Sequence, residues 1–219
     1  MYVSDEYRLV YLAQPRTASR AVAHLLKTQF GAEEVSCQGS QFGAGHHSAG
    51  VEYTVKYQRR GYTVFTVVRN HWDAVVSWWY NNQGGVARGA PNAAAQKKSW
   101  DNWLDYWCRD EQTNRWTGPG QLFGYLPPMA DRVIRYENLE AELSKLIGQP
   151  VEIPQMGRSP RVHYSHYFSA EEREQVGDYY AAEIELYGYG FESGHDCEAL
   201  CSNHRHQPAW MSGLGVSNA

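Results

Sequence analysis

The feature that most constrains this sequence is a strand that leads directly into a short polar turn and then into a helix. The three parts are residues 8–14 (RLVYLAQ), 15–19 (PRTAS) and 20–26 (RAVAHLL). The first turn of a helix has backbone N–H groups without partners and a partial positive charge. Arg16 adds a cation, and Thr17 and Ser19 add hydroxyl donors. The segment therefore suits a phosphate group, although the Walker A spacing is absent.

A second strand–turn–helix segment follows the same plan. Residues 62–68 (YTVFTVV) are predicted to form a buried strand, and residues 74–80 (AVVSWWY) an apolar helix. Arg69 follows the strand, and Asn70 is a candidate N-cap with Asp73 three residues later. An arginine at the end of a strand can bind a phosphate through two N–H bonds. The alternative is that Arg69 only pairs with Asp73.

In their order along the chain, these segments resemble sulfotransferases that use 3′-phosphoadenosine 5′-phosphosulfate (PAPS). The turn is similar to the family's 5′-phosphosulfate loop, which usually reads Pro-Lys/Arg-Thr-Gly/Ala-Ser/Thr-Ser/Thr. Residues 68–80 are similar to its 3′-phosphate segment, in which an arginine at the strand end and a serine eight residues later hold the phosphate. The corresponding residues here are Arg69 and Ser77.

Two later segments resemble the same family. Residues 133–139 (VIRYENL) are similar to its RYEDL segment, and residues 163–191 to the terminal helix of the Golgi-type carbohydrate sulfotransferases. Ser169 and Glu172 predict a capping box at the start of that helix. The resemblance covers roughly residues 7–191, apart from residues 81–130.

The resemblance and the alternation of elements imply a three-layer α/β fold, with a central parallel sheet flanked by helices, as in P-loop-NTPase-like sulfotransferases. Strands are predicted at residues 7–14, 33–37, 62–68 and 131–136. Helices are predicted at residues 18–30, 48–60, 71–82, 99–109, 137–147 and 170–187, with a loop at residues 83–98. Residues 1–191 are predicted as one sulfotransferase domain, and residues 192–219 as a tail that is partly disordered or a small Cys/His-rich appendage.

The implied reaction is sulfuryl transfer from PAPS to a hydroxyl acceptor, with 3′-phosphoadenosine 5′-phosphate (PAP) as product and no metal. The residues expected to bind the nucleotide are Pro15, Arg16, Thr17, Ala18, Ser19, Arg20, Arg69, Ser77, Arg158 and Arg161. Arg16 is also expected to stabilise charge that develops on the transferred group. The family more often has lysine there, and because arginine stays protonated, it does not serve as a proton donor.

A hydroxyl acceptor needs a base, and His46 and His47 precede the helix predicted at residues 48–60. In the heparan 2-O-sulfotransferase-like group a catalytic histidine lies upstream of the 3′-phosphate arginine, just before such a helix. His47, 22 residues before Arg69, fits that spacing best, and His46 is the rival. The pair could instead only cap the helix or be exposed. Glu52 and Glu137 are the next candidates.

Composition limits the partners. The net charge of −4 argues against a general nucleic-acid binder. There is no stretch of membrane-spanning length and no apolar signal core, which favours a soluble, cytoplasmic protein. The acceptor is expected to be a glycan. Trp100, Trp103 and Trp107 form one helical stripe, either as core packing or as a platform for a sugar or aromatic acceptor.

The tail contains Cys197, Cys201, His204 and His206. This spacing permits a small zinc knuckle or a local disulfide, but matches no strong template. Two other functions stay open for the whole chain. One is a non-catalytic protein of sulfotransferase fold that binds a nucleotide or glycan. The more distant one is a kinase, for which no Walker lysine or Mg²⁺-ligand pattern is present.

Overall fold

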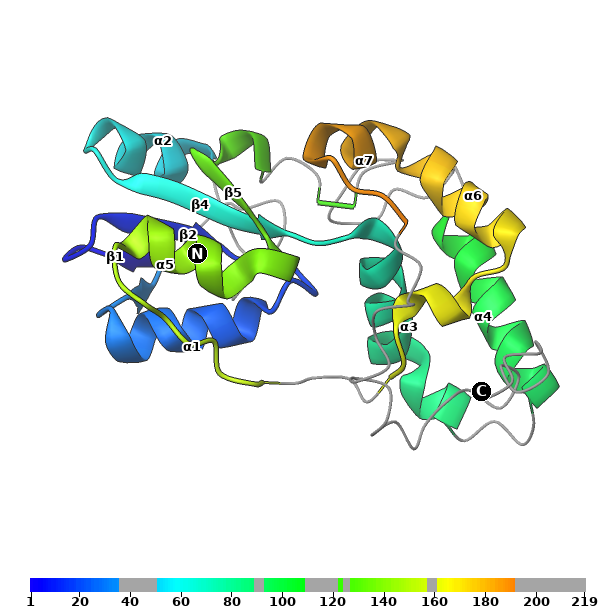
Figure 1. The fold of residues 1–219 in the computed structure, drawn as a ribbon. Coiled ribbons are helices and arrows are strands. Elements are labelled where there is room, and N and C mark those ends of the chain that lie inside the picture. Colours follow the sequence, from blue (N-terminus) through cyan, green and yellow to red (C-terminus); the bar gives the residue numbers. More distant parts are fainter. Residues whose placement is uncertain (36–50, 89–92, 109–121, 124–126, 157–160, 192–219) are drawn as a thin grey trace. The chain divides into compact units, whose positions relative to one another are not determined.

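The chain folds into two compact units, seen in a computed structural model that describes residues 1–35, 51–88, 93–108, 122–123, 127–156 and 161–191 (Figure 1). Unit 1 consists of Met1–Arg69 and Asn114–Gly157, and unit 2 of Asn70–Thr113 and Arg158–Ala219. The described residues form five strands and seven α-helices. All five strands belong to unit 1, whereas the described elements of unit 2 are all helical.

The sheet of unit 1 has the order β3-β1-β2-β4-β5. Its strands are β1 (Tyr2–Ser4), β2 (Leu9–Leu12), β3 (Glu33–Glu34), β4 (Thr63–Val68) and β5 (Arg132–Arg135). β2, β4 and β5 are parallel, with Leu12 opposite Thr66 and Val68 opposite Arg135. β1 runs antiparallel to both β2 and β3. The α/β class is confirmed, but the prediction of an all-parallel sheet is wrong, because β1 makes the sheet mixed.

Strand β1 was not predicted from the sequence because the turn that follows it lacks the usual sequence signal. β1 and β2 form a hairpin in which Ser4 lies opposite Leu9. The left-handed position of the turn is held by Arg8, with φ 52°, rather than by glycine or asparagine. A three-residue strand before such a turn gives no pattern of its own.

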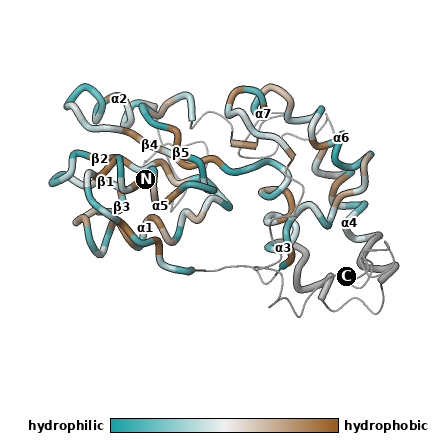
Figure 2. Tube along the Cα trace, in the orientation of Figure 1, coloured by the Kyte–Doolittle hydropathy of each residue, from teal (hydrophilic) through white to brown (hydrophobic). Residues whose placement is uncertain are grey.

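Helices cover both faces of this sheet, so that the predicted three layers are present in unit 1. On one face, α1 (Ser19–Gln29) and α5 (Leu139–Ile147) pack on a core that includes Tyr11 and Phe65. On the other face, α2 (Val51–Arg59) contributes Tyr53 and Tyr57 to a smaller cluster. Figure 2 shows hydrophobic residues along the central strands, and β2 is buried at all four positions. Alternate residues of these strands face opposite layers.

Unit 2 contains α3 (His71–Arg88), α4 (Ala93–Trp107), α6 (Ala170–Tyr179) and α7 (Ala181–Tyr187). Short 3₁₀ turns occur at Pro127–Met129 and Tyr136–Asn138 in unit 1 and at Tyr164–Tyr167 in unit 2. The loop predicted at residues 83–98 is wrong, because α3 extends to Arg88 and α4 starts at Ala93. The alanines there favour helix over the turn tendency of the nearby glycines and asparagines.

The helix predicted at residues 170–187 is divided at Tyr180, three residues after Gly177 in the last turn of α6. The predicted capping box at its start is confirmed, since the Ser169 side chain accepts from the Glu172 N–H and the Glu172 carboxylate accepts from the Ser169 N–H. The core of unit 2 is aromatic. Trp79, Trp100 and Tyr167 pack with ring centroids 5.6–6.1 Å apart, and this geometry is typical of edge-to-face and tilted aromatic pairs.

Candidate functional site

The two predicted phosphate segments follow adjacent parallel strands at the point where the chain connections diverge. From β2 the chain goes through α1 to β3 on one side of the sheet, and β4 leads to β5 on the other side. β2 and β4 are direct neighbours. In open α/β sheets, ligands bind at the carboxyl ends of strands at such a switch point. The loop at residues 13–18 and Arg69 occupy this position in unit 1.

Hydrogen bonds within unit 1 fix the loop between β2 and α1. The Thr17 hydroxyl donates to the Gln14 carbonyl oxygen at 2.9 Å, and the Gln14 amide donates to the Phe123 carbonyl oxygen at 2.8 Å. Arg16 and Ala18 have left-handed φ angles of 62° and 59°. This conformation costs an L-residue roughly 1–2 kcal/mol and is found often at ligand-binding loops. Thr17 is fully buried, so its hydroxyl supports the loop from inside.

The amino end of α1 has neither a side-chain cap nor an acidic residue in its first turn. Its N-cap position is Ala18, whose side chain has no acceptor, and Ser19 is the first helical residue. By contrast, α6 has a capping box and two acidic residues in its first turn. The partial positive charge of the α1 terminus is therefore not offset by its own first turn, which suits an anion there. Arg20, next in the helix, is exposed.

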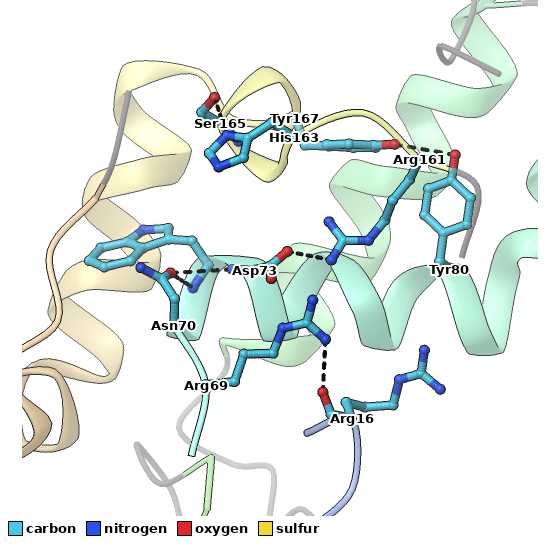
Figure 3. Close-up of polar contacts among 10 residues, drawn as sticks. Arg16, Arg69, Asn70, Asp73, Tyr80, Arg161, His163, Ser165 and Tyr167 are labelled. Carbon is cyan, nitrogen blue, oxygen red and sulfur yellow. Dashed lines mark hydrogen bonds and ion pairs between the residues drawn. The ribbon is translucent and has the colours of Figure 1, made fainter. Parts of the chain in front are cut away.

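Arg69 connects the end of β4 to this loop. Its Nη1 donates to the carbonyl oxygen of Arg16 at 2.9 Å (Figure 3). The guanidinium carbon also lies 4.0 Å from the centre of the Tyr136 ring, directly after β5. Only 8% of Arg69 is exposed. Residues that follow three neighbouring parallel strands thus meet around one guanidinium.

A buried phenol lies beneath the loop. Tyr11 is inaccessible to solvent in the middle of β2, and its ring stacks on Phe65 with centroids 4.9 Å apart. Burial raises the pKa of Tyr11 far above its usual value, and the nearby Thr17 hydroxyl offsets part of that increase. Within the described residues the Tyr11 hydroxyl makes no hydrogen bond of good geometry. Tyr11 is therefore neutral at physiological pH and serves as part of the floor of the loop.

In unit 2, the amino end of α3 is capped as the sequence predicts. The Asn70 side-chain oxygen accepts from the N–H groups of Trp72 and Asp73 at 3.1 and 3.4 Å. Asp73 forms an ion pair with Arg161, and both side chains are largely buried (Figure 3). Arg161 was predicted to bind the nucleotide, and its described partner is this carboxylate. Ser77, one turn beyond Asp73, is also buried.

Two more polar pairs lie in unit 2. The Tyr167 hydroxyl donates to the Tyr80 hydroxyl at 3.2 Å, and burial is the main cause that raises the pKa of Tyr167. His71 Nε2 and Glu183 Oε2 lie 3.0 Å apart in a buried pair, and the rings of Tyr180, Tyr187 and Tyr189 surround His71 at centroid distances of 5.4–6.5 Å. Neither pair was anticipated from the sequence, because their partners are separated by 87 and 112 residues.

The other predicted residues have different outcomes. His46, His47 and Arg158 lie outside the described residues, as do the cysteines and histidines of the tail. Glu52 and Glu137 are both exposed in unit 1. Of the tryptophan stripe, Trp100 is fully buried and donates to Glu172 at 3.0 Å, which favours its interpretation as core packing.

Sequence reasoning missed Tyr136 and Gln14 as parts of the candidate site. Tyr136 falls in the segment similar to RYEDL and directly after a predicted strand, so its position next to the other two strand ends was accessible in principle. Gln14 gave no such signal, because its partner Phe123 lies 109 residues away in a stretch without a recognised motif.

No protein-family model, curated protein or solved structure matches this chain. Among the helices in the described part of the chain, none is long and apolar enough to span a membrane. In the same described residues, no group of three or more His, Cys, Asp or Glu side chains is arranged to hold a metal ion.

Proposed function

We propose that this protein is a sulfotransferase that binds PAPS and moves its sulfuryl group to a hydroxyl acceptor on a glycan. The observation that carries this proposal is the contact between Arg69 and the Arg16 carbonyl. It joins two segments that each resemble a phosphate-binding segment of the family, at the switch point of a parallel β2–β4 pair. The sulfotransferase-type fold is part of the same proposal.

Different parts of unit 1 would bind the two anionic groups of the nucleotide. The loop at residues 15–19 and the uncapped amino end of α1 would accept the 5′-phosphosulfate, with Arg16 as the cation. Arg69 would bind the 3′-phosphate through its guanidinium. Thr17 would hold the loop instead of binding the ligand, because its hydroxyl is buried and donates to the Gln14 carbonyl.

The proposed reaction is an in-line displacement at sulfur. The acceptor oxygen forms a bond to sulfur while the bond from sulfur to the bridging phosphate oxygen breaks, and PAP leaves with the bonding electrons. His47, or His46 in its place, takes the acceptor proton. Arg16 stabilises the negative charge that grows on the leaving phosphate. Positioning and charge stabilisation supply most of the rate in such transfers.

Calorimetry of the full chain with PAP, AMP and ATP tests the nucleotide assignment. We expect PAP to bind far more tightly than either, since a 3′-phosphate adds charge-assisted bonds worth roughly 1.5–3 kcal/mol each. Equal affinity for PAP and AMP would overturn the proposal. Screening hydroxyl acceptors with labelled PAPS would then separate an enzyme from a protein that only binds the nucleotide, because only an enzyme transfers label.

A further inference from the structure

The guanidinium of Arg69 is held on two sides by groups from different segments of unit 1. One edge donates to the Arg16 carbonyl oxygen, and the carbon lies 4.0 Å from the Tyr136 ring centre. Tyr136 is half-buried and packs against the same core as α1 and α5. The ring is thus itself fixed by the core, and it precedes α5 in a short 3₁₀ turn.

These two contacts restrict different motions of a flexible side chain. A ring attracts a cation placed over its face, and the attraction is stronger when water is excluded, as it is around a side chain with 8% exposure. The Arg16 carbonyl attracts one N–H and so limits rotation of the guanidinium over the ring. Together they fix the direction of the guanidinium before a ligand arrives, which lowers the entropy lost on binding.

We propose that Tyr136 is a positioning residue, whose ring orients Arg69 for a phosphate at the carboxyl ends of β4 and β5. The inference rests on the proposed function in one respect, since it takes the 3′-phosphate of PAP as the group that Arg69 binds. The ring acts through its face, so its hydroxyl is dispensable. Tyr136 therefore determines how strongly the site distinguishes a nucleotide with a 3′-phosphate from one without.

The test compares three variants by calorimetry with PAP and AMP. Tyr136→Leu removes the ring and should weaken PAP by about 3- to 30-fold, the range expected for a cation over an aromatic ring, while AMP is unchanged. Tyr136→Phe keeps the ring and should bind PAP as the wild type does. Tyr7→Leu is the matched control, because Tyr7 is half-buried against the same core and packs on Phe30 at 5.0 Å. Tyr7→Leu should lower the free energy of unfolding about as much as Tyr136→Leu does, and it should leave the affinity for PAP unchanged.

The outcomes separate the inference from the proposed function. A wild-type protein that fails to prefer PAP over AMP overturns the proposed function. An unchanged PAP-to-AMP ratio in Tyr136→Leu, or a loss in Tyr136→Phe as large as in Tyr136→Leu, overturns the inference alone. Side-chain NMR of the free protein gives a measure that needs no nucleotide. The Arg69 Nε–H should carry a ring-current shift in wild type and Tyr136→Phe that disappears in Tyr136→Leu, and its persistence in Tyr136→Leu would also refute the role of the ring.

Discussion

Among the described residues, buried polar side chains in unit 1 mostly bond to the backbone, whereas those in unit 2 mostly bond to each other. In unit 1, Gln14, Thr66 and Arg69 donate to the carbonyl oxygens of other segments at 2.7–2.9 Å. In unit 2, the corresponding contacts join His71 to Glu183, Trp100 to Glu172, Arg161 to Asp73 and Tyr167 to Tyr80.

This difference determines whether the partner of a substituted side chain still has a hydrogen bond. A carbonyl oxygen has two lone pairs, so one that loses a side-chain donor can keep its backbone bond. A buried carboxylate or imidazole that loses its partner retains the full cost of desolvation. Substitutions of polar residues in unit 1 should therefore report mainly on ligand binding and catalysis, and those in unit 2 mainly on folding.

The largest effect that we expect from a substitution in unit 1 is on catalysis. His47→Ala should lower kcat by about 10²- to 10⁴-fold, because the acceptor proton then has no base. PAP affinity should change little, since the base contacts the acceptor. In the wild type, turnover should fall as pH drops below neutrality, because an imidazole that is already protonated cannot accept a proton.

His46→Ala is the matched control and should cost much less than His47→Ala. A reversal of the two effects would assign the base to His46. If neither variant loses activity, both histidines are excluded, and Glu52 and Glu137 become the residues to replace.

The next effect concerns folding of unit 2. Glu183→Ala should reduce the free energy of unfolding by about 1–3 kcal/mol, the cost of taking the hydrogen-bond partner from a buried polar group, because His71 stays buried without the Glu183 carboxylate. Urea denaturation measures the change. Glu185→Ala on the same helix is the control, since Glu185 is exposed and should cost less than about 0.5 kcal/mol. Equal losses in both variants would show that the pair contributes nothing.

A comparison of two arginines tests the contrast directly. Arg69→Ala should weaken PAP by about 10- to 100-fold, because it removes charge-assisted bonds to the 3′-phosphate. Arg161→Ala should instead lower stability, since it removes the ion-pair partner of the largely buried Asp73 carboxylate. Calorimetry and urea denaturation of both variants give the two readouts. A loss of PAP affinity in Arg161→Ala as large as in Arg69→Ala would place Arg161 in the nucleotide site, as the sequence predicts.

The smallest effect is expected inside the sheet. Thr66→Val removes the hydroxyl that donates to the Leu12 carbonyl at 2.7 Å and should cost about 1 kcal/mol, the net value of one such bond. Thr63→Val, at the half-buried start of the same strand, is the control for the change in shape and should cost less. A loss above about 3 kcal/mol in Thr66→Val would contradict the expectation that substitutions of polar residues in unit 1 have little effect on folding.

Much of unit 1 could be predicted from the sequence because its signals are local. In unit 1 the runs at residues 62–68 and 131–136 became β4 and β5. In unit 2 the cap at Asn70 and the capping box at Ser169 also formed as expected. Each of these depends on residues within a few positions of one another, so the pattern and its cause lie in the same window.

The candidate site was predicted in part for the same reason. Parallel strands place their carboxyl ends at one edge, so two strand–turn–helix segments in sequence were enough to bring Arg16 and Arg69 together. The antiparallel β1, the break at Tyr180 and the role of Tyr136 were not anticipated. A short strand before an atypical turn, a helix break at a tyrosine, and a ring that contacts a distant guanidinium give little signal in the local sequence.

The sequence by itself thus determined β2, β4 and β5, the caps of α3 and α6 and the turn between β2 and α1, because backbone propensity and capping act over a few residues. Tertiary structure alone decided the pairs of unit 2 and the orientation of Arg69. The partners of His71 and Arg69 come from positions 112 and 53 residues away. Which buried groups meet across such distances follows from how the helices and strands pack, and that packing is a property of the whole chain.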